Sequence, residues 1–460
     1  MSKAKLLALL LLGFLLASLY LPKVASSFSP GEIFTSSQEL LPDQYIVVYK
    51  DNVSNPDTVT DDLEKLHLLR SRSRFSKVIK GFSSFLSQEK LERLKKDPRV
   101  AFITQDREVS IVFHSSRRRT KTPTPTRTST PTRTPTPQKS STPSPSKTPT
   151  PTPTTSLTSQ TIPLGISRIG LNGVNEGSGI GVAIIDTGID LDHPDLAQNI
   201  IANKSCISGE PNGDDDHGHG THVAGTVAAL NNSTGVIGVA PQAKLIAVKV
   251  LNSQGSGSYS SLICGIDWIT ANVANYNIKV ANMSLGGGGA SDGNCGNSNS
   301  DALHLAICRS RDAGITYVVA AGNSGANAAS TVPAAYDDAV ITVSALADSD
   351  GQPGGLGPNT SYGSDDTFAS FSNYGGVVDL GGPGVNILST YRGGGYGNMS
   401  GTSMSSPHVA GAASLYLKTN PQATWSQVRD GLMGAGESLN SGHTDPSGLH
   451  PEKVVKTNSL

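Results

Sequence analysis

The sequence of 460 residues is poor in several features that mark other classes of protein. It has four cysteines and no CxxC pair, which argues against a zinc ribbon or a dithiol redox site. After the first 20 residues, no run approaches the roughly 20 apolar residues that a membrane-spanning helix needs. Basic residues are scarce from Thr161 onward, with 12 Lys/Arg against 24 Asp/Glu, which argues against nucleic acid as a partner.

The first residues have the composition of an export signal. Lys3 and Lys5 precede a leucine-rich run, and small residues follow around Ala25. We therefore predict a signal peptide at residues 1–27 and a secreted protein that has no membrane association once the signal is removed. An uncleaved signal anchor is the alternative.

Two further segments precede the acidic region. Residues 114–160 hold ten of the 27 prolines and no acid, and repeated Thr-Pro steps favour an extended, solvated chain, so we predict a linker at 114–158. Residues 43–113 alternate between strand-like and helix-like patterns, which predicts a small α+β domain. The expected strands and helices are Tyr45–Tyr49, Val59–Leu69, Phe82–Leu86, a helix around Leu91 and Leu94, and Val100–Ile103.

All four cysteines lie after the linker. An even number in an exported chain indicates disulfides, and four cysteines allow three pairings. Cys295 and Cys308 are close in sequence, so we favour Cys295–Cys308 together with Cys206–Cys264. The alternative is that one pair remains as buried thiols.

Three short motifs contain candidate catalytic residues. Ser403 lies in Gly-Thr-Ser-Met-Ser-Ser-Pro-His-Val-Ala-Gly, at the start of an Ala-rich helical run. Asp186 ends the apolar run Gly-Val-Ala-Ile-Ile-Asp, and His219 begins His-Gly-Thr-His-Val-Ala-Gly. A serine becomes nucleophilic when an imidazole takes its proton and a carboxylate orients that imidazole. The chain order Asp, His, Ser is one of those known for such a set.

Together these motifs resemble the subtilase family of serine endopeptidases, over nearly all of residues 159–440. The resemblance implies an α/β fold with a mostly parallel twisted sheet and helices on both faces, and leaves 441–460 as a C-terminal tail. It assigns Ser403 as the nucleophile, His219 as the base and then the acid, and Asp186 as the orienting carboxylate. It also implies a monomeric enzyme that acts on proteins or peptides.

The family motif selects His219 from three neighbouring histidines. The rival interpretation is a metal site built from His217, His219 and His222 with the acids of 214–216. No HExxH pattern is present, and the glycine-rich start indicates the beginning of a helix. We therefore favour the catalytic role for His219, with His222 as a helix histidine that supports packing or hydrogen bonding.

By the same resemblance, residues 43–113 are similar to the propeptide of subtilases, an intramolecular chaperone and product-like inhibitor. An unrelated ferredoxin-like module is the alternative. The tail from about Glu108 to His114 is then expected along the active-site cleft of a zymogen. In the family this tail runs directly into the mature N-terminus, whereas here the linker intervenes and leaves the maturation site open. We therefore expect that, before the chain is cleaved, the tail can lie in the cleft while Gln160 takes its place in the calcium loop described below.

The resemblance also implies residues for transition-state stabilisation and substrate binding. Asn323 in Ala-Ala-Gly-Asn would donate its amide to the oxyanion, together with the Ser403 backbone N–H. Two cleft-lining segments would pair with an extended peptide, and small residues would form the walls of the primary pocket. These residues are Gly255, Ser256, Gly257, Ser284, Leu285, Gly286, Ala320, Ala321 and Gly322.

The segment Leu230–Pro241 matches the family's tight calcium loop in length and register. Calcium takes 6–8 oxygen ligands, which backbone carbonyls and side-chain amides supply. The implied ligands are Gln160, Asp195, Leu230, Asn232, Thr234 and Val236. A second, weaker site would use the carbonyls of Asp338 and Val340 with the carboxylate of Asp379. An ordinary Asn- and Gly-rich loop is the alternative for the first site.

Two other functions remain open at this point. One is a pseudoprotease that serves as a binding module, which the intact catalytic set argues against. The other is a surface display protein with the Thr/Pro segment as its stalk. One departure from the common pattern is Ser405, which replaces the alanine usually found two residues after the nucleophile.

Overall fold

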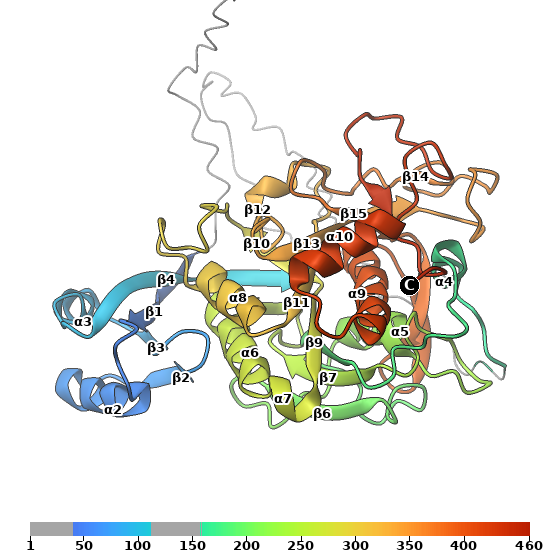
Figure 1. Ribbon diagram of the computed structural model, residues 1–460. Coiled ribbons are helices and arrows are strands. Elements are labelled where there is room, and N and C mark those ends of the chain that lie inside the picture. The colour runs from blue at the N-terminus through green and yellow to red at the C-terminus, as the bar shows by residue number, and fades with distance from the viewer. Residues whose placement is uncertain (1–39, 112–156, 158) are drawn as a thin grey trace, which may run out of the picture. The chain divides into compact units, whose positions relative to one another are not determined.

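The computed structural model describes residues 40–111, 157 and 159–460 (Figure 1). The predicted signal peptide, and the predicted linker except for Leu157, lie outside these residues. Within the described part of the chain, no helix is long and apolar enough to cross a membrane.

The N-terminal domain is a four-stranded antiparallel sheet in the order β4-β1-β3-β2 with two helices. Its elements are β1 (Leu40–Tyr49), α2 (Pro56–His67), β2 (Ser71–Phe75), β3 (Gly81–Phe85), α3 (Gln88–Leu94) and β4 (Val100–Ile111). Phe82 of β3, Leu63 of α2 and Leu94 of α3 share one buried core. The α+β expectation is confirmed, but the sequence analysis missed β2. Its sequence Ser-Arg-Ser-Arg-Phe has no apolar alternation, and it lies at the edge of the sheet, paired with β3.

The C-terminal domain contains a sheet in the order β18-β15-β13-β11-β9-β5-β7-β6, in which every neighbouring pair is parallel. These strands are β5 (Gly181–Asp186), β6 (Ile200–Ser205), β7 (Lys244–Lys249), β9 (Ile278–Met283), β11 (Thr316–Ala320), β13 (Val340–Ala347), β15 (Leu380–Pro383) and β18 (Lys453–Val454). The short β14 (Thr367–Phe368) pairs antiparallel with β13. The expected mostly parallel α/β sheet is therefore confirmed. β18 lies within the segment 441–460, which thus contributes a strand to this sheet.

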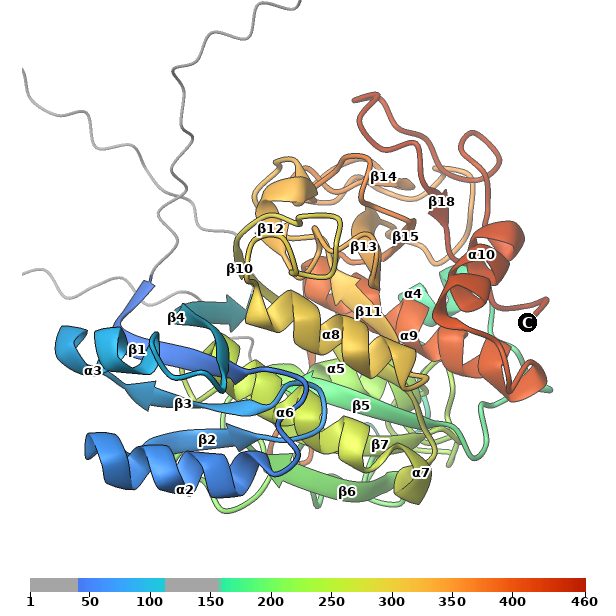
Figure 2. The same cartoon turned by 60° about the vertical axis from the view of Figure 1, so that its left-hand side comes forward.

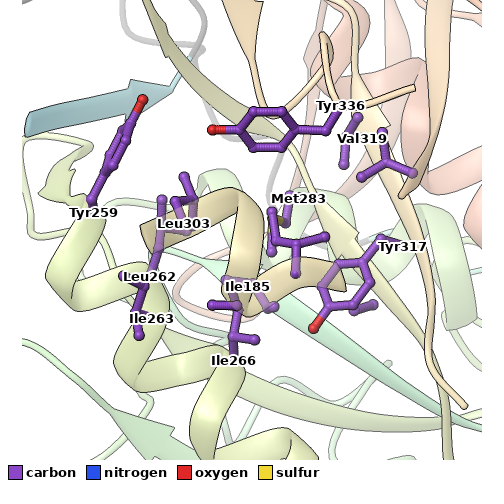
Figure 3. Close-up of a cluster of buried hydrophobic side chains, with 14 of the residues drawn as sticks. Ile185, Tyr259, Leu262, Ile263, Ile266, Met283, Leu303, Tyr317, Val319 and Tyr336 are labelled. Carbon is purple, nitrogen blue, oxygen red and sulfur yellow. The ribbon is translucent and has the colours of Figure 1, made fainter. Parts of the chain in front are cut away.

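Helices cover both faces of this sheet, because its strands are apolar on both sides (Figures 1 and 2). Along β5, Ile185 joins the core cluster under α6 (Tyr259–Ala271) and α8 (Ala302–Asp312), which Figure 3 shows. The preceding residue, Ile184, joins the cluster under α5 (His219–Ala228) and α9 (Thr402–Thr419). Successive strand residues point to opposite faces, so one apolar run serves both cores.

The remaining elements are short and lie around the sheet. They are α4 (Leu164–Ile169), β8 (Ser256–Ser258), α7 (Val273–Tyr276), β10 (Leu285–Gly288), a 3-10 turn η1 (Ala328–Ser330), β12 (Thr331–Val332), the hairpin β16 (Ile387–Tyr391) and β17 (Gly395–Met399), and α10 (Trp425–Ala435). Both favoured disulfides, Cys206–Cys264 and Cys295–Cys308, are present, which confirms the pairing. The alternative of one buried thiol pair is wrong for this structure.

Candidate active site

The end of β4 lies as a strand between two segments of the C-terminal domain. It pairs antiparallel with β8 on one side and with β10 on the other, and Figure 2 shows β4 reaching the region of β10. Ser110 is opposite Ser256 in β8 and opposite Gly286 in β10. The predicted course of the tail is therefore confirmed as far as Ile111, the last residue described before the linker. The two segments expected to bind an extended peptide do bind an extended strand of this chain.

Asp186 and His219 come together at the carboxyl end of the parallel sheet. Asp186 is the last residue of β5, and His219 is the first residue of α5. The distance between His219 Nδ1 and Asp186 Oδ1 is 2.8 Å, and both side chains are buried. The Thr187 backbone N–H also donates to Asp186 Oδ1, at 2.7 Å. Because the carboxylate accepts from Nδ1–H, the imidazole presents Nε2 as its proton acceptor. Nε2 has no hydrogen-bond partner among the described residues.

A second carboxylate, Asp215, holds the start of α5 in place. Its oxygens accept from the backbone N–H groups of His217, Gly218 and Thr221, at 2.9, 2.9 and 3.0 Å. Gly218 has a φ of 106°, in the region that favours glycine, so the chain can turn sharply into the helix at His219. From the sequence, Asp215 was expected only as one of the acids of the rival metal site. Its position four residues before His219, the first residue of α5, is the signal that could have indicated a role in holding the helix start.

Ser403 is the second residue of α9, and its side chain is buried. Its hydroxyl donates to the carbonyl oxygen of Ser284 at 3.2 Å. Helices α5 and α9 pack against each other, so His219 and Ser403 lie at the first turns of two adjacent helices. No hydrogen bond joins these two side chains in the described structure.

Asn323 lies beside the first turn of α9. Its Oδ1 accepts from both the backbone N–H and the hydroxyl of Thr402, each at 2.8 Å, which fixes the orientation of the amide. A Cβ atom placed on Gly401 would lie 3.0 Å from Asn323 Nδ2 and 3.7 Å from the Ser403 backbone nitrogen. The two nitrogens that the resemblance assigns to the oxyanion therefore flank the same glycine.

The predicted pocket walls follow the ends of two neighbouring strands. Ser284–Gly286 come after β9, and the wall formed by Ala320–Gly322 begins at the last residue of β11, which pairs with β9. Asn373, which the sequence analysis missed, supports the second wall. Its Nδ2 donates to the Ala321 carbonyl at 3.0 Å, and its Oδ1 accepts from the Ser324 N–H at 3.0 Å. Asn373 is distant in sequence, so no local pattern indicates this role.

The histidine-rich segment is not arranged as a metal site. His222 Nε2 contacts the carbonyl oxygens of Ile387 and Gly397 at 2.9 and 3.1 Å, and burial lowers its pKa to about 3. This confirms the predicted hydrogen-bonding role of His222, which joins α5 to the β16–β17 hairpin. Within the described residues, the groups of His, Cys, Asp and Glu close enough to share an ion include none of the three histidines.

The first predicted calcium set converges in space. Gln160 Nε2 lies 2.7, 3.3 and 3.5 Å from the carbonyl oxygens of Leu230, Val236 and Thr234. The Asp195 carboxylate accepts from Asn232 Nδ2 and from the Val236 N–H, both at 2.9 Å. Rotation of the Gln160 amide by half a turn would add its oxygen to three carbonyls, which is the hard donor set that calcium prefers. The residues therefore fit the ion.

The second predicted calcium set fits a cation less well. The Asp338 carbonyl accepts from the Arg311 guanidinium, and Arg429 Nε lies 3.9 Å from Asp379 Oδ1. Asp379 Oδ2 also accepts from the Thr342 N–H at 2.9 Å. Two positive side chains thus already face the oxygens that this site would use.

Comparison with known proteins gives matches for both domains. The model of the subtilase family matches residues 177–447, and the model of peptidase inhibitor I9 matches residues 44–112. The chain is 43% identical to Subtilisin Savinase of Lederbergia lenta over 295 residues, which are 63% of this chain and 97% of that protein. It is 43% identical to Subtilisin DY of Bacillus licheniformis over 288 residues, or 61% and 93% of the two chains. A solved cold adapted subtilisin-like serine proteinase matches with a TM-score of 0.53 and 33% identity, covering 64% of this chain and 97% of the other.

Proposed function

Because this chain belongs to the subtilase family of serine endopeptidases, we propose that it is secreted as a zymogen and hydrolyses peptide bonds through Asp186, His219 and Ser403. The observation that carries the proposal is the buried 2.8 Å contact between His219 Nδ1 and Asp186 Oδ1. It leaves Nε2 as a base at the first turn of the helix that packs on α9, where Ser403 lies.

In the proposed reaction, the Ser403 hydroxyl leaves the Ser284 carbonyl, turns toward His219 and attacks the scissile carbonyl carbon. Nε2 takes the hydroxyl proton, and Asp186 stabilises the imidazolium. The carbonyl oxygen becomes an oxyanion that accepts from Asn323 Nδ2 and the Ser403 N–H. Nε2 then gives its proton to the leaving amine, and a water molecule repeats the sequence to release the acyl group.

The substrate in this proposal is an extended segment of a protein or peptide. It would take the place of β4 between β8 and β10 and bind mainly through backbone hydrogen bonds. Such binding tolerates many sequences, because each residue carries the same backbone groups. The N-terminal domain would act as an inhibitor until β4 is displaced, and the enzyme would work as a monomer.

Calcium is proposed as a structural ion at the first set of ligands. Gln160, Asp195 and Asn232 would bind it through side chains, and Leu230, Thr234 and Val236 through carbonyls. A bound ion would stabilise the native loop without taking part in the reaction. Asp338, Val340 and Asp379 remain the weaker second proposal.

The linker makes this chain unlike a propeptide that runs directly into its enzyme. β4 occupies the cleft while Gln160 contacts its loop, in one uncut chain. A total of 48 residues separates Ile111 from Gln160 in the sequence. We infer that the calcium loop is complete before cleavage, because neither contact has to break for the other to form.

A fluorophosphonate probe tests the catalytic assignment. We expect it to label the matured protein and not Ser403→Ala, which should lose peptide hydrolysis by on the order of 10⁴–10⁶ in kcat. The magnitude comes from measurements on a subtilisin. Ser405→Ala is the matched control, since it removes a neighbouring buried hydroxyl and restores the residue usual in the family. Equal labelling of Ser403→Ala would favour a binding module with a different reactive residue.

A further inference from the structure

A cluster of three buried carboxylates lies outside the sites described above. Asp348 follows the end of β13, and Asp365 and Asp366 precede β14, so that the glycine-rich segment between them forms a loop. All three residues are at least 95% buried. One carboxylate oxygen from each lies within 4.8 Å of the others.

Two of these carboxylates accept hydrogen bonds from several donors. Asp365 accepts from the Ser349 N–H and hydroxyl and from the Gly357 N–H, at 2.7, 2.9 and 2.7 Å. Asp366 accepts from Arg168 Nε at 2.6 Å and from the N–H groups of two loop glycines at 2.8 and 3.0 Å. A carboxylate offers about four lone-pair sites, so each retains capacity for another partner.

Asp348 differs from them. Its Oδ1 accepts from the Gly351 N–H at 3.1 Å, whereas its Oδ2 is buried and has no hydrogen-bond partner in the described structure. Arg168 Nε is 4.0 Å from Asp348 Oδ1, beyond hydrogen-bond distance. A buried carboxylate oxygen with no partner reduces the stability of the fold, because it has lost its hydrogen bonds to water without gaining others.

The surroundings do not supply enough positive charge. Arg168 binds Glu437 through two hydrogen bonds of 3.0 and 2.6 Å in addition to Asp366, and Lys456 lies 3.9 Å from Glu437. His443 also faces Glu437, at 3.0 Å. This network of four carboxylates, Asp348, Asp365, Asp366 and Glu437, thus contains one arginine and one lysine, with His443 beside Glu437. Burial and the neighbouring Asp366 raise the pKa of Asp348 to about 7, which is the expected result of this imbalance.

We propose that Asp348, Asp365 and Asp366 bind a calcium ion that fastens the loop 349–364 to the sheet. The site would be separate from the Asp195 loop and from the catalytic residues. Carboxylates are hard oxygen donors, and calcium accepts the irregular geometries that such loops provide. The ion would give Asp348 Oδ2 its missing partner and balance the excess negative charge.

The test uses the full-length Ser403→Ala protein, which does not digest itself, at pH 8 after removal of metal with chelator. Calorimetric titration with calcium chloride should show one fewer ion bound per chain when Asp348→Asn is added. Asp350→Asn is the matched control, because Asp350 lies in the same loop but outside the cluster. A parallel titration with magnesium chloride shows whether the site distinguishes the two ions.

Thermal unfolding of the same variants distinguishes a calcium ion bound to Asp348 from a proton carried by Asp348. With a bound ion, Asp348→Asn should lower the midpoint in excess calcium and raise it in chelator, where the substitution only removes repulsion. A higher midpoint under both conditions, or unchanged calcium stoichiometry, would overturn the proposal and leave the Asp195 site unaffected. If Asp348→Asn does not fold, crystals of Ser403→Ala soaked in terbium chloride decide the question. Anomalous density beside Asp348 supports the site, and density only at the Asp195 loop refutes it.

Discussion

Asp106 is the residue whose replacement best tests how the N-terminal domain inhibits the enzyme. It lies in β4, and its carboxylate accepts from the Ser260 N–H at 3.1 Å and from the Ser260 hydroxyl at 2.6 Å. Ser260 is in the first turn of α6, so the carboxylate also faces the positive end of that helix. Asp106 is only 1% exposed. The contact therefore anchors the strand just before it enters the cleft.

The structure sets the size of the expected effect. Asp106→Ala removes two hydrogen bonds to a charged acceptor. It leaves the buried Ser260 N–H without this acceptor, while the Ser260 hydroxyl keeps its 2.9 Å contact with the Ser258 hydroxyl. Each lost or unsatisfied bond costs about 1–3 kcal/mol, so we expect a total of about 3 kcal/mol. This corresponds to inhibitor binding weaker by on the order of 100-fold. Asp106→Asn retains an accepting oxygen and should weaken binding by roughly tenfold.

Progress curves provide the assay. Cleaved but undissociated protein is diluted into a chromogenic peptide, and the rate at which activity appears at several substrate concentrations gives the inhibition constant. Asp62→Ala is the control, because that carboxylate belongs to the same domain and its side chain is 57% exposed. If Asp106→Ala inhibits as tightly as the unaltered protein, the contact with Ser260 does not hold the domain in place and the reasoning fails.

Three further predictions concern pH and calcium. The Asp267 carboxylate accepts from the backbone N–H groups of Lys77 and Val78 in the N-terminal domain, and burial raises its pKa, so it takes up a proton more readily in the bound state. Inhibition should therefore tighten as pH falls through this raised pKa, and progress curves that do not change with pH would contradict this. Chelation of calcium should lower the thermal midpoint and speed autolysis of the mature enzyme, because a ligand bound only by the native state stabilises it by RT ln(1 + [L]/Kd). An unchanged midpoint would contradict the calcium site proposed at Asp195. In the uncut Ser403→Ala zymogen, Gln160→Ala should weaken calcium binding and lower the midpoint while Gln422→Ala, on the surface, should not; equal values for Gln160→Ala and its parent would mean that Gln160 is not bound before processing.

The catalytic motifs could be found from the sequence because their geometry is largely local. Asp186 ends an apolar strand, His219 follows a glycine turn into a helix, and Ser403 opens an Ala-rich helix. Such positions depend on residues a few places away, and parallel strands bring their carboxyl ends to one edge of the sheet. The disulfides were also predicted, because only three pairings exist and one pair is close in sequence.

Contacts between distant residues depended on the tertiary structure. Asp106 reaches Ser260, and Asn373 supports the wall at Ala321, yet neither side chain belongs to a local pattern that indicates its partner. The isolation of Asp348 Oδ2 likewise follows from how the loop folds against Arg168. Turns, helix starts and strand ends are determined by neighbours along the chain. Burial and hydrogen-bond satisfaction depend on which segments pack together, and that is decided only when the whole chain has folded.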